Sequence, residues 1–141
     1  MVIADRFQAY ADAFEAAYAD DDWSRLEEYF TEDCEYDAGQ GPEHVTRGRD
    51  NLLAWFQGAV NDFDRKMDSR EIVFAEAPRE TSSGVVTVPW KAIFKKSGAP
   101  DLVMSGIETA EFEGDRIRVL RDAYDEGVPE LIDAWMSEHG V

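Results

Sequence analysis

The segment "VVTVPWKAIFK", residues 85–95, contains the clearest strand pattern in the sequence. Apolar side chains recur at every second position, as they do on one face of a β-strand. That face carries Val86, Val88, Trp90, Ala92 and Phe94. The other face is more polar, with Thr87, Lys91 and Lys95. This alternation predicts a strand of an antiparallel sheet that places one face on the core.

Further strand-like runs lie on both sides of this segment after Asp68, giving four in total. They are separated by the turn sequences "PRETSSG", "KSGAP" and "EGD", residues 78–84, 96–100 and 113–115. Pro89 has no backbone N–H to donate to a neighbouring strand, so we expect a bulge or a sheet edge there.

The first half of the chain has the 3.6-residue period of amphipathic helices. One helix is predicted from Phe7 to Tyr18, and Asp22 is a plausible N-cap for a short second helix. A short strand, "EDCEYDAG" at 32–39, precedes a third helix from about Asp50 that includes Phe56. A final helix near Pro129 is predicted to bury Val128, Leu131, Ile132, Trp135 and Met136.

Helices that precede a run of antiparallel strands indicate an α+β fold. We expect a single domain, residues 1–141, with a cone shape in which the N-terminal helices pack on a curved, mostly antiparallel sheet. A strongly curved sheet covered by helices tends to leave a pocket between the two layers.

The composition argues against several classes of partner. The chain has 31 acidic residues and 14 Lys and Arg, for a formal net charge of −17. This charge disfavours nucleic acid and anionic membranes as partners. The lone Cys34 and the histidines His44 and His139 have no zinc-like spacing, so no metal site is predicted. The N-terminal sequence has no secretion-signal pattern, and we expect a soluble, cytoplasmic protein.

The order of elements and three motifs resemble the nuclear transport factor 2-like superfamily. The motifs are "LEEYFTEDCEYD" (26–37), "TRGRDNLLAWF" (46–56) and "FEGDRIRVLRDAYD" (112–125). This superfamily includes the SnoaL-like polyketide cyclases, limonene epoxide hydrolase and ketosteroid isomerase. The resemblance covers nearly the whole chain, and its motifs identify a fold that catalysts and non-catalytic binders share.

The resemblance implies positions for a catalytic site. Asp122 matches the catalytic aspartate of limonene epoxide hydrolase, and Tyr36 matches its pocket tyrosine. Glu108 matches the acid of ketosteroid isomerase that donates a hydrogen bond to the substrate oxygen. Other catalytic positions depart from both families: Val88, Trp90 and Ala92 replace an inward arginine and aspartate, and Phe14 and Ala38 replace a tyrosine and an aspartate.

The candidate catalytic residues are therefore Asp122, Glu108 and Tyr36. The candidate substrate-binding residues are Phe14, Tyr18, Phe56, Val88, Trp90, Leu120 and Tyr124. If Asp122 faces an apolar pocket, burial raises its pKa toward the range of a general acid or base. The alternative is an ordinary solvated or ion-paired aspartate, and a one-residue register slip would turn Glu108 outward.

Three functions remain open at this stage. The first is a SnoaL-like enzyme without metal or organic cofactor, which isomerises, cyclises or dehydrates a small, mostly apolar carbonyl or hydroxyl compound by acid–base chemistry. The second is a non-catalytic binding protein for a small hydrophobic ligand. The third is a structural dimeric domain. A homodimer is expected in any case, through an outer sheet face that carries Thr87, Ile93, Ile107 and Thr109.

Overall fold

The computed structural model describes residues 2–140 and has the predicted α+β architecture. Its α-helices are α1 (Ile3–Asp20), α2 (Arg49–Asp62) and α3 (Val128–His139). Three short 3₁₀ helices are η1 (Trp23–Tyr29), η2 (Pro42–His44) and η3 (Asp64–Lys66). The strands are β1 (Phe30–Asp37), β2 (Thr46–Arg47), β3 (Ser69–Phe74), β4 (Arg79–Ser82), β5 (Val85–Lys95), β6 (Leu102–Glu113) and β7 (Arg116–Tyr124).

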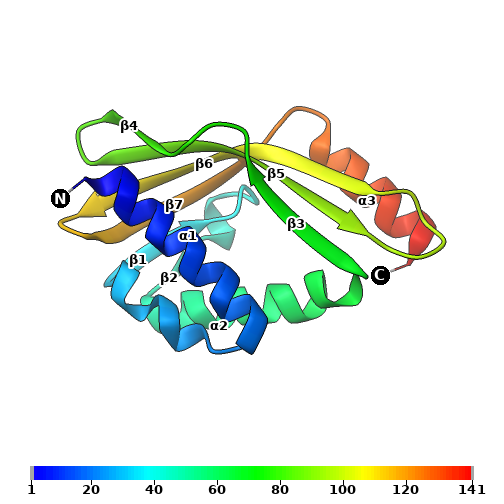
Figure 1. Ribbon diagram of the computed structural model, residues 1–141, viewed down its shortest axis with the longest axis horizontal. Coiled ribbons are helices and arrows are strands. Elements are labelled where there is room, and N and C mark those ends of the chain that lie inside the picture. Colours follow the sequence, from blue (N-terminus) through cyan, green and yellow to red (C-terminus); the bar gives the residue numbers. More distant parts are fainter. Residues whose placement is uncertain (1, 141) are drawn as a thin grey trace.

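The strands form one curved, mostly antiparallel sheet. Their order is β2-β1-β7-β6-β5-β3, with β4 also paired to β5. Only the contact between β1 and β7 is parallel, among the strands of the described chain. The sheet arches over α1 and α2, which cover its concave face (Figure 1). This confirms the predicted arrangement of helices on a curved sheet.

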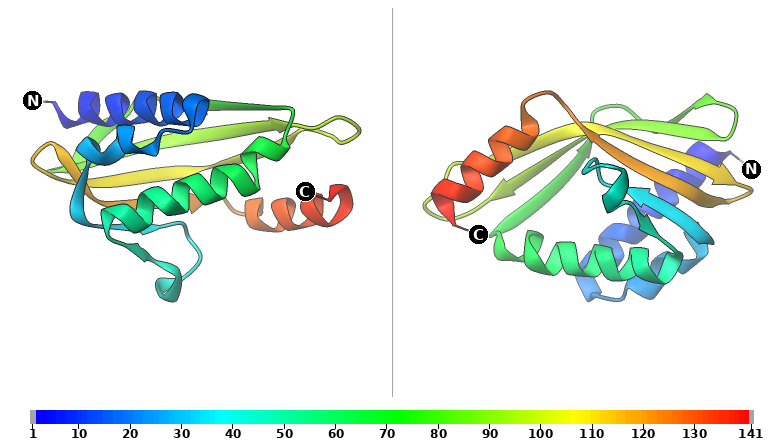
Figure 2. Two further views of the ribbon diagram at one scale, coloured as in Figure 1. Left: turned by 90° about the horizontal axis from the view of Figure 1, so that it is seen from below. Right: turned by 180° about the vertical axis from the view of Figure 1, so that it is seen from behind.

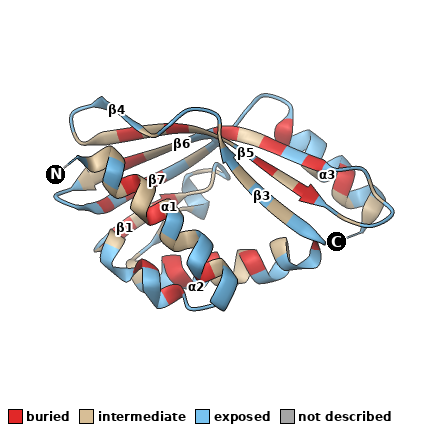
Figure 3. Ribbon diagram, viewed as in Figure 1, coloured by how far each residue is buried: buried red, intermediate tan, exposed pale blue. Residues whose placement is uncertain are grey.

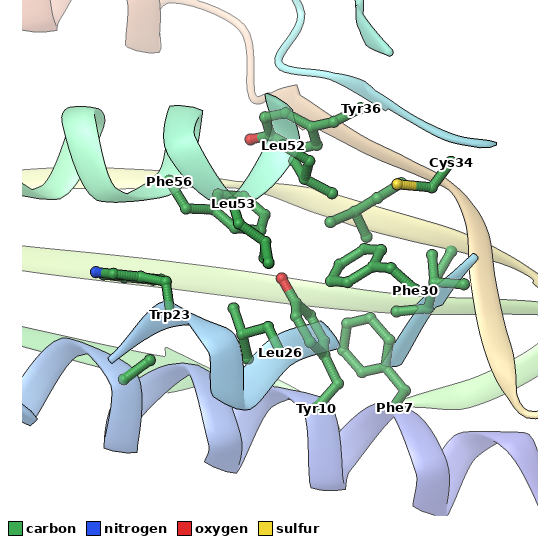
Figure 4. Packing of buried hydrophobic residues seen from close by; sticks show 14 of the residues in the cluster. Phe7, Tyr10, Trp23, Leu26, Phe30, Cys34, Tyr36, Leu52, Leu53 and Phe56 are labelled. Atoms are coloured by element: carbon green, nitrogen blue, oxygen red, sulfur yellow. The ribbon is translucent and has the colours of Figure 1, made fainter. Parts of the chain in front are cut away.

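A hydrophobic cluster closes one end of the cone. Its members come from α1, η1, β1 and α2 and from the sheet, and the helices turn their buried residues toward the sheet (Figure 3). Phe7, Leu26 and Phe30 have no accessible surface, and the rings of Tyr10 and Phe30 meet edge to face at 5.3 Å (Figure 4). Burial of this many large apolar side chains supplies the main driving force for folding.

A second hydrophobic cluster joins the far end of the sheet to α3. This helix lies beside β5 and β6, at the end of the molecule away from the N-terminus (Figure 2). Phe94, Leu102 and Trp135 form its centre, and the indole N–H of Trp135 donates to the carbonyl of Pro100 at 2.9 Å. Leu131 is 48% exposed, so the prediction that it is buried was wrong.

Two predicted details of the strands also need correction. The "PRETSSG" segment is more than a turn, because its residues 79–82 form β4, whose side chains are all exposed. Of the two alternatives predicted for Pro89, a bulge or a sheet edge, the bulge is wrong, because the register of β5 and β6 runs unbroken from Val85 to Phe94. On the opposite edge of β5, Pro89 lies between the residues paired to β3 and those paired to β4. A residue without an N–H is accommodated there because no partner strand continues past it.

The short helix η1 begins as predicted. The Asp22 side chain accepts a hydrogen bond from the backbone N–H of Ser24, although the helix is of the 3₁₀ type. No helix within residues 2–140 is long and apolar enough to cross a membrane.

Candidate functional site

A cavity of about 470 Å³ lies between the sheet and the helices, in contact with both hydrophobic clusters. Its volume is within the usual range for small-molecule sites. Its wall is rich in aromatic residues: Tyr10, Phe14, Tyr36, Trp55, Phe56, Phe63, Phe74, Trp90, Phe94 and Tyr124. Its charged residues are Glu15, Asp62, Asp64, Arg70, Glu108 and Asp122.

Two carboxyl groups from neighbouring strands meet on the sheet wall of this cavity. Glu108 on β6 and Asp122 on β7 are direct antiparallel partners. Tyr36 on the adjacent strand β1 donates a hydrogen bond from its hydroxyl to Oδ2 of Asp122 at 2.6 Å. Tyr36 is paired in register with Leu120, so Asp122 lies two residues farther along β7, on the same face of the sheet.

Burial separates the proton affinities of these two acids. The pKa of Glu108 is raised well above its usual value, first by burial and then by the charge of Asp122. Burial also raises the pKa of Asp122, but hydrogen bonds from Glu108 and Tyr36 act in the opposite direction. The pair therefore holds its proton on Glu108, and Asp122 is the ionised acceptor of two hydrogen bonds.

A further tyrosine is close to the acid pair. Tyr10, on α1, is buried, and burial together with the charges of Glu108 and Asp122 raises its pKa well above the usual value. Its ring rises from α1 toward the interior of the cluster (Figure 4). Tyr10 is not among the site residues predicted from the sequence. The sequence feature that could have identified it is the apolar stripe of the first helix, on which Tyr10 precedes the candidate residue Phe14 by one turn.

The aromatic wall above the pair depends on a glycine. The rings of Trp90 and Tyr124 meet edge to face, with centroids 5.8 Å apart. Gly106 is the cross-strand partner of both residues, and a Cβ there would lie 3.1 Å from the Trp90 ring and 2.3 Å from the carbonyl oxygen of Ala123. The absence of a side chain at Gly106 lets the indole lie close to the sheet. The indole N–H of Trp90 is buried and has no hydrogen-bond acceptor among residues 2–140.

A second ionic group lies at a different part of the cavity. Arg70, on β3, is only 6% exposed and contacts Glu15 at 2.6 Å and Asp64 at 2.7 Å. Burial raises the pKa of Asp64, and the charge of Arg70 partly opposes that effect. This cluster joins α1, η3 and β3 across the helix–sheet gap.

The structure brings most of the predicted site residues together. Asp122, Glu108, Tyr36, Phe14, Phe56, Trp90 and Tyr124 all line the cavity. Val88 and Leu120 face the same side of the sheet, but they are packed in the first hydrophobic cluster and are not part of the described lining. Tyr18 is also outside this lining, and its ring packs beneath the guanidinium of Arg70 at 4.6 Å. The three residues therefore shape the core around the cavity.

Residues 8–120 match the family model of the SnoaL-like domain. The chain belongs to this family. The match includes most of α1, all of α2, the β1 strand with Tyr36 and the β6 strand with Glu108; it ends two residues before Asp122 and does not include α3. A comparison with curated proteins finds no significant match to this SnoaL-like domain.

Solved structures share the fold of this SnoaL-like domain at low sequence identity. Bal32a from a soil-derived mobile gene cassette is 16% identical, with a TM-score of 0.69 over 94% of this chain and 98% of that chain. An LEH-like epoxide hydrolase of M. tuberculosis is 14% identical, with a TM-score of 0.63 over 92% and 88%. A putative SnoaL-like polyketide cyclase of Shewanella putrefaciens is 10% identical, with a TM-score of 0.66 over 94% and 86%.

Proposed function

We propose that this SnoaL-like domain is a cofactor-independent acid–base enzyme. Its substrate is a small, mostly apolar compound that carries a carbonyl or hydroxyl group, and the reaction is an isomerisation, cyclisation or dehydration. The observation that carries the proposal is the Glu108–Asp122 pair in an aromatic cavity, with Tyr36 bonded to Asp122. Two carboxyl groups with separated pKa values are a common arrangement for one base and one acid.

The proposed roles follow from the direction of the hydrogen bonds. Asp122, as the ionised member, removes a proton from the carbon next to a carbonyl group. Glu108, as the protonated member, donates its hydrogen bond to the carbonyl oxygen on which negative charge develops. Return of the proton to a different carbon gives isomerisation, and attack of the enolate carbon on a second carbonyl gives cyclisation.

The same pair supports elimination of water. In that case Asp122 takes a proton from the carbon next to a carbonyl, and Glu108 gives its proton to the departing hydroxyl group. Tyr36 keeps Asp122 oriented through the 2.6 Å hydrogen bond. A substrate bound against the aromatic wall displaces water, which strengthens each of these electrostatic contacts.

The base role is tested without knowledge of the natural substrate by proton exchange of small cyclic ketones in D₂O, followed by NMR. We expect the protein to accelerate exchange of the α-protons, and Asp122→Asn to lower the rate by about 10²–10⁴-fold. Asp62→Asn is the matched control because Asp62 lines the same cavity and is exposed. Equal rates for wild type and Asp122→Asn, or no acceleration by wild type across the ketones, would refute the proposal.

A non-catalytic binding function is the second candidate, and the cavity wall on β5 favours it. Trp90 and Ala92 supply only apolar surface where the resemblance to limonene epoxide hydrolase implied charged residues. A ligand that copurifies with the protein and is recovered unchanged after long incubation would support this function. Recovery of a product would exclude it.

The homodimer remains a proposal that concerns the outer face of the sheet. Val103 and Ile107 are 39% and 45% exposed there, beside the half-buried Thr87, Ile93 and Thr109. Two copies packed through this face would cover these apolar side chains. Light scattering at micromolar concentration is expected to give twice the chain mass, and a monomer mass would contradict the dimer. The single domain and the cytoplasmic location likewise remain predictions.

A further inference from the structure

We propose that the cavity selects organic cations, and that the ammonium group of its ligand lies between the Glu108–Asp122 pair and the surrounding aromatic rings. The inference rests on the proposed function in one respect, the assignment of this cavity as the ligand site. It adds a substrate class that acid–base chemistry alone does not specify: a compound with a positively charged amino group.

The first argument is the imbalance of charge in the cavity wall. Five carboxyl side chains line it, but Arg70 is the only cationic side chain in the lining given by residues 2–140. Arg70 is already engaged with Glu15 and Asp64. The acid pair on the sheet therefore has no cationic partner, and its polar contacts are Tyr36 and the hydrogen bond within the pair.

Glu108 and Asp122 are half-buried, and a carboxylate partly withdrawn from water without a counter-charge is a costly arrangement. A cationic ligand removes that cost because it supplies the missing counter-charge, whereas an anionic ligand adds a second repulsion. A neutral ligand leaves the electrostatics of the pair unchanged. The negative charge of the cavity therefore predicts that, among ligands of equal shape, a cation binds most tightly, a neutral compound less tightly and an anion most weakly.

The second argument is the aromatic wall. Tyr36 and Tyr124 flank Asp122 in the lining, and Trp90 packs edge to face on Tyr124. The negative faces of such rings attract ammonium groups, and the attraction is greater where water is excluded. The cavity wall already shows this contact on its helical side, since the guanidinium of Arg70 lies 5.7 Å from the ring centre of Phe14. The net charge of −17 further favours the approach of cations.

The ionisable groups around the pair supply no counter-charge to Asp122. They are Tyr10, Tyr36, Asp37 and Tyr124, and the three tyrosines remain neutral because burial raises their pKa values. The ligand's ammonium group would be the counter-charge of Asp122, and the proton would stay on Glu108, as the proposed function requires.

Three ligands of similar shape and different charge test the inference by calorimetry. They are 3-hydroxyphenyltrimethylammonium, 3-tert-butylphenol and 3-hydroxybenzenesulfonate, which share a ring and a hydroxyl and carry a tetrahedral group of charge +1, 0 and −1. We expect the ammonium compound to bind about tenfold or more tightly than the neutral compound, and the sulfonate to bind most weakly. Equal or tighter binding of either other ligand, or no binding of the ammonium compound, would overturn the inference.

One variant of the pair locates the cation. Asp122→Asn removes the ionised carboxylate, so it should reduce the preference for the ammonium over the neutral compound to near unity while both compounds still bind. Glu113→Gln should retain the preference, because Glu113 is an exposed acid outside the cavity lining of the described chain. A preference that survives Asp122→Asn would refute the placement.

The ligand-binding test and the ketone-exchange test can give different answers, so the inference and the proposed function can fail separately. Selective cation binding without ketone exchange would leave the inference standing and refute the acid–base enzyme. Ketone exchange that depends on Asp122, together with no preference for the ammonium compound, would support the enzyme and overturn the inference.

Discussion

Glu108 and Asp122 are opposite each other on the neighbouring antiparallel strands β6 and β7, and both carboxyl groups line the same cavity. Like charges placed directly across a strand pair are destabilising. The pair avoids that repulsion because Glu108 keeps its proton and donates it in a hydrogen bond to Asp122. The arrangement stabilises the folded protein less than an apolar pair would, so a functional role accounts for it better than a structural one.

The raised pKa of Glu108 predicts that the protein loses stability as the pH rises. The unfolded chain releases this proton near pH 4.5, whereas the folded chain still holds it above that pH. The folded state therefore binds more protons, and the free energy of unfolding falls from pH 4.5 up to the folded pKa. Glu108→Gln should remove this slope and be more stable than wild type at pH 8.

Urea denaturation at pH 4.5, 6 and 8 measures this difference. Glu113→Gln is a suitable control because Glu113 lies on the same strand and is exposed. A stability gain for Glu108→Gln that is the same at all three pH values would contradict the raised pKa.

Removal of the Tyr36 hydroxyl should raise the pKa of Asp122. The 2.6 Å hydrogen bond favours the ionised carboxylate, so Tyr36→Phe makes protonation easier. The pH dependence of ketone exchange should shift to higher pH on its acid side, with a lower maximum rate. Tyr29→Phe provides the control since Tyr29 is outside the cavity lining of the described chain. An unshifted profile in Tyr36→Phe would argue against Asp122 as the base.

The sequence predicted correctly which side of the sheet each residue faces, but it did not predict which of these residues line the cavity and which are packed in the core. Val88 and Leu120 face the same side of the sheet as Trp90 and Asp122, as expected. Each lies two residues earlier on its strand, however, and is packed in the first hydrophobic cluster instead of lining the cavity. Alternation fixes which side of a sheet a residue faces, and it carries no information on position along a cone. The depth of the cavity depends on packing between helices and strands that are distant in sequence.

The resemblance placed Glu108 and Asp122 in one pocket, but it could not give their direct cross-strand pairing, for a related reason. The pairing depends on the register of β6 against β7, and that register shifts at an irregularity between Glu111 and Phe112. A slip by one residue would have turned Glu108 outward. Tyr10 was missed because a tyrosine on an apolar helical stripe has the same pattern as a core residue, and only the folded structure shows its nearness to the acids.

The Arg70 ion-pair cluster should contribute strongly to stability. Arg70→Met leaves Asp64, which is 17% exposed, without its guanidinium partner and should lower the free energy of unfolding by about 3–5 kcal/mol. The loss should be smaller at acid pH, where Asp64 is protonated. Arg121→Met breaks the exposed pair with Glu111 and should cost less than about 1 kcal/mol. Similar losses in the two variants would show that the Arg70 cluster behaves as an ordinary surface network.

Two glycine-to-alanine substitutions should have opposite effects on stability. At Gly106 a Cβ would lie 2.3 Å from the carbonyl oxygen of Ala123, which is backbone and cannot move aside cheaply. Gly106→Ala should therefore destabilise the protein by about 1–3 kcal/mol or more and displace the Trp90 ring.

At Gly58, within α2, a Cβ would meet nothing within 4 Å, so Gly58→Ala should stabilise the helix by about 0.5–1 kcal/mol. Urea denaturation followed by far-UV circular dichroism measures both effects, and near-UV circular dichroism reports the Trp90 environment. A neutral Gly106→Ala would mean that β6 and β7 can separate locally, in which case the strand register that places Glu108 opposite Asp122 is not rigid.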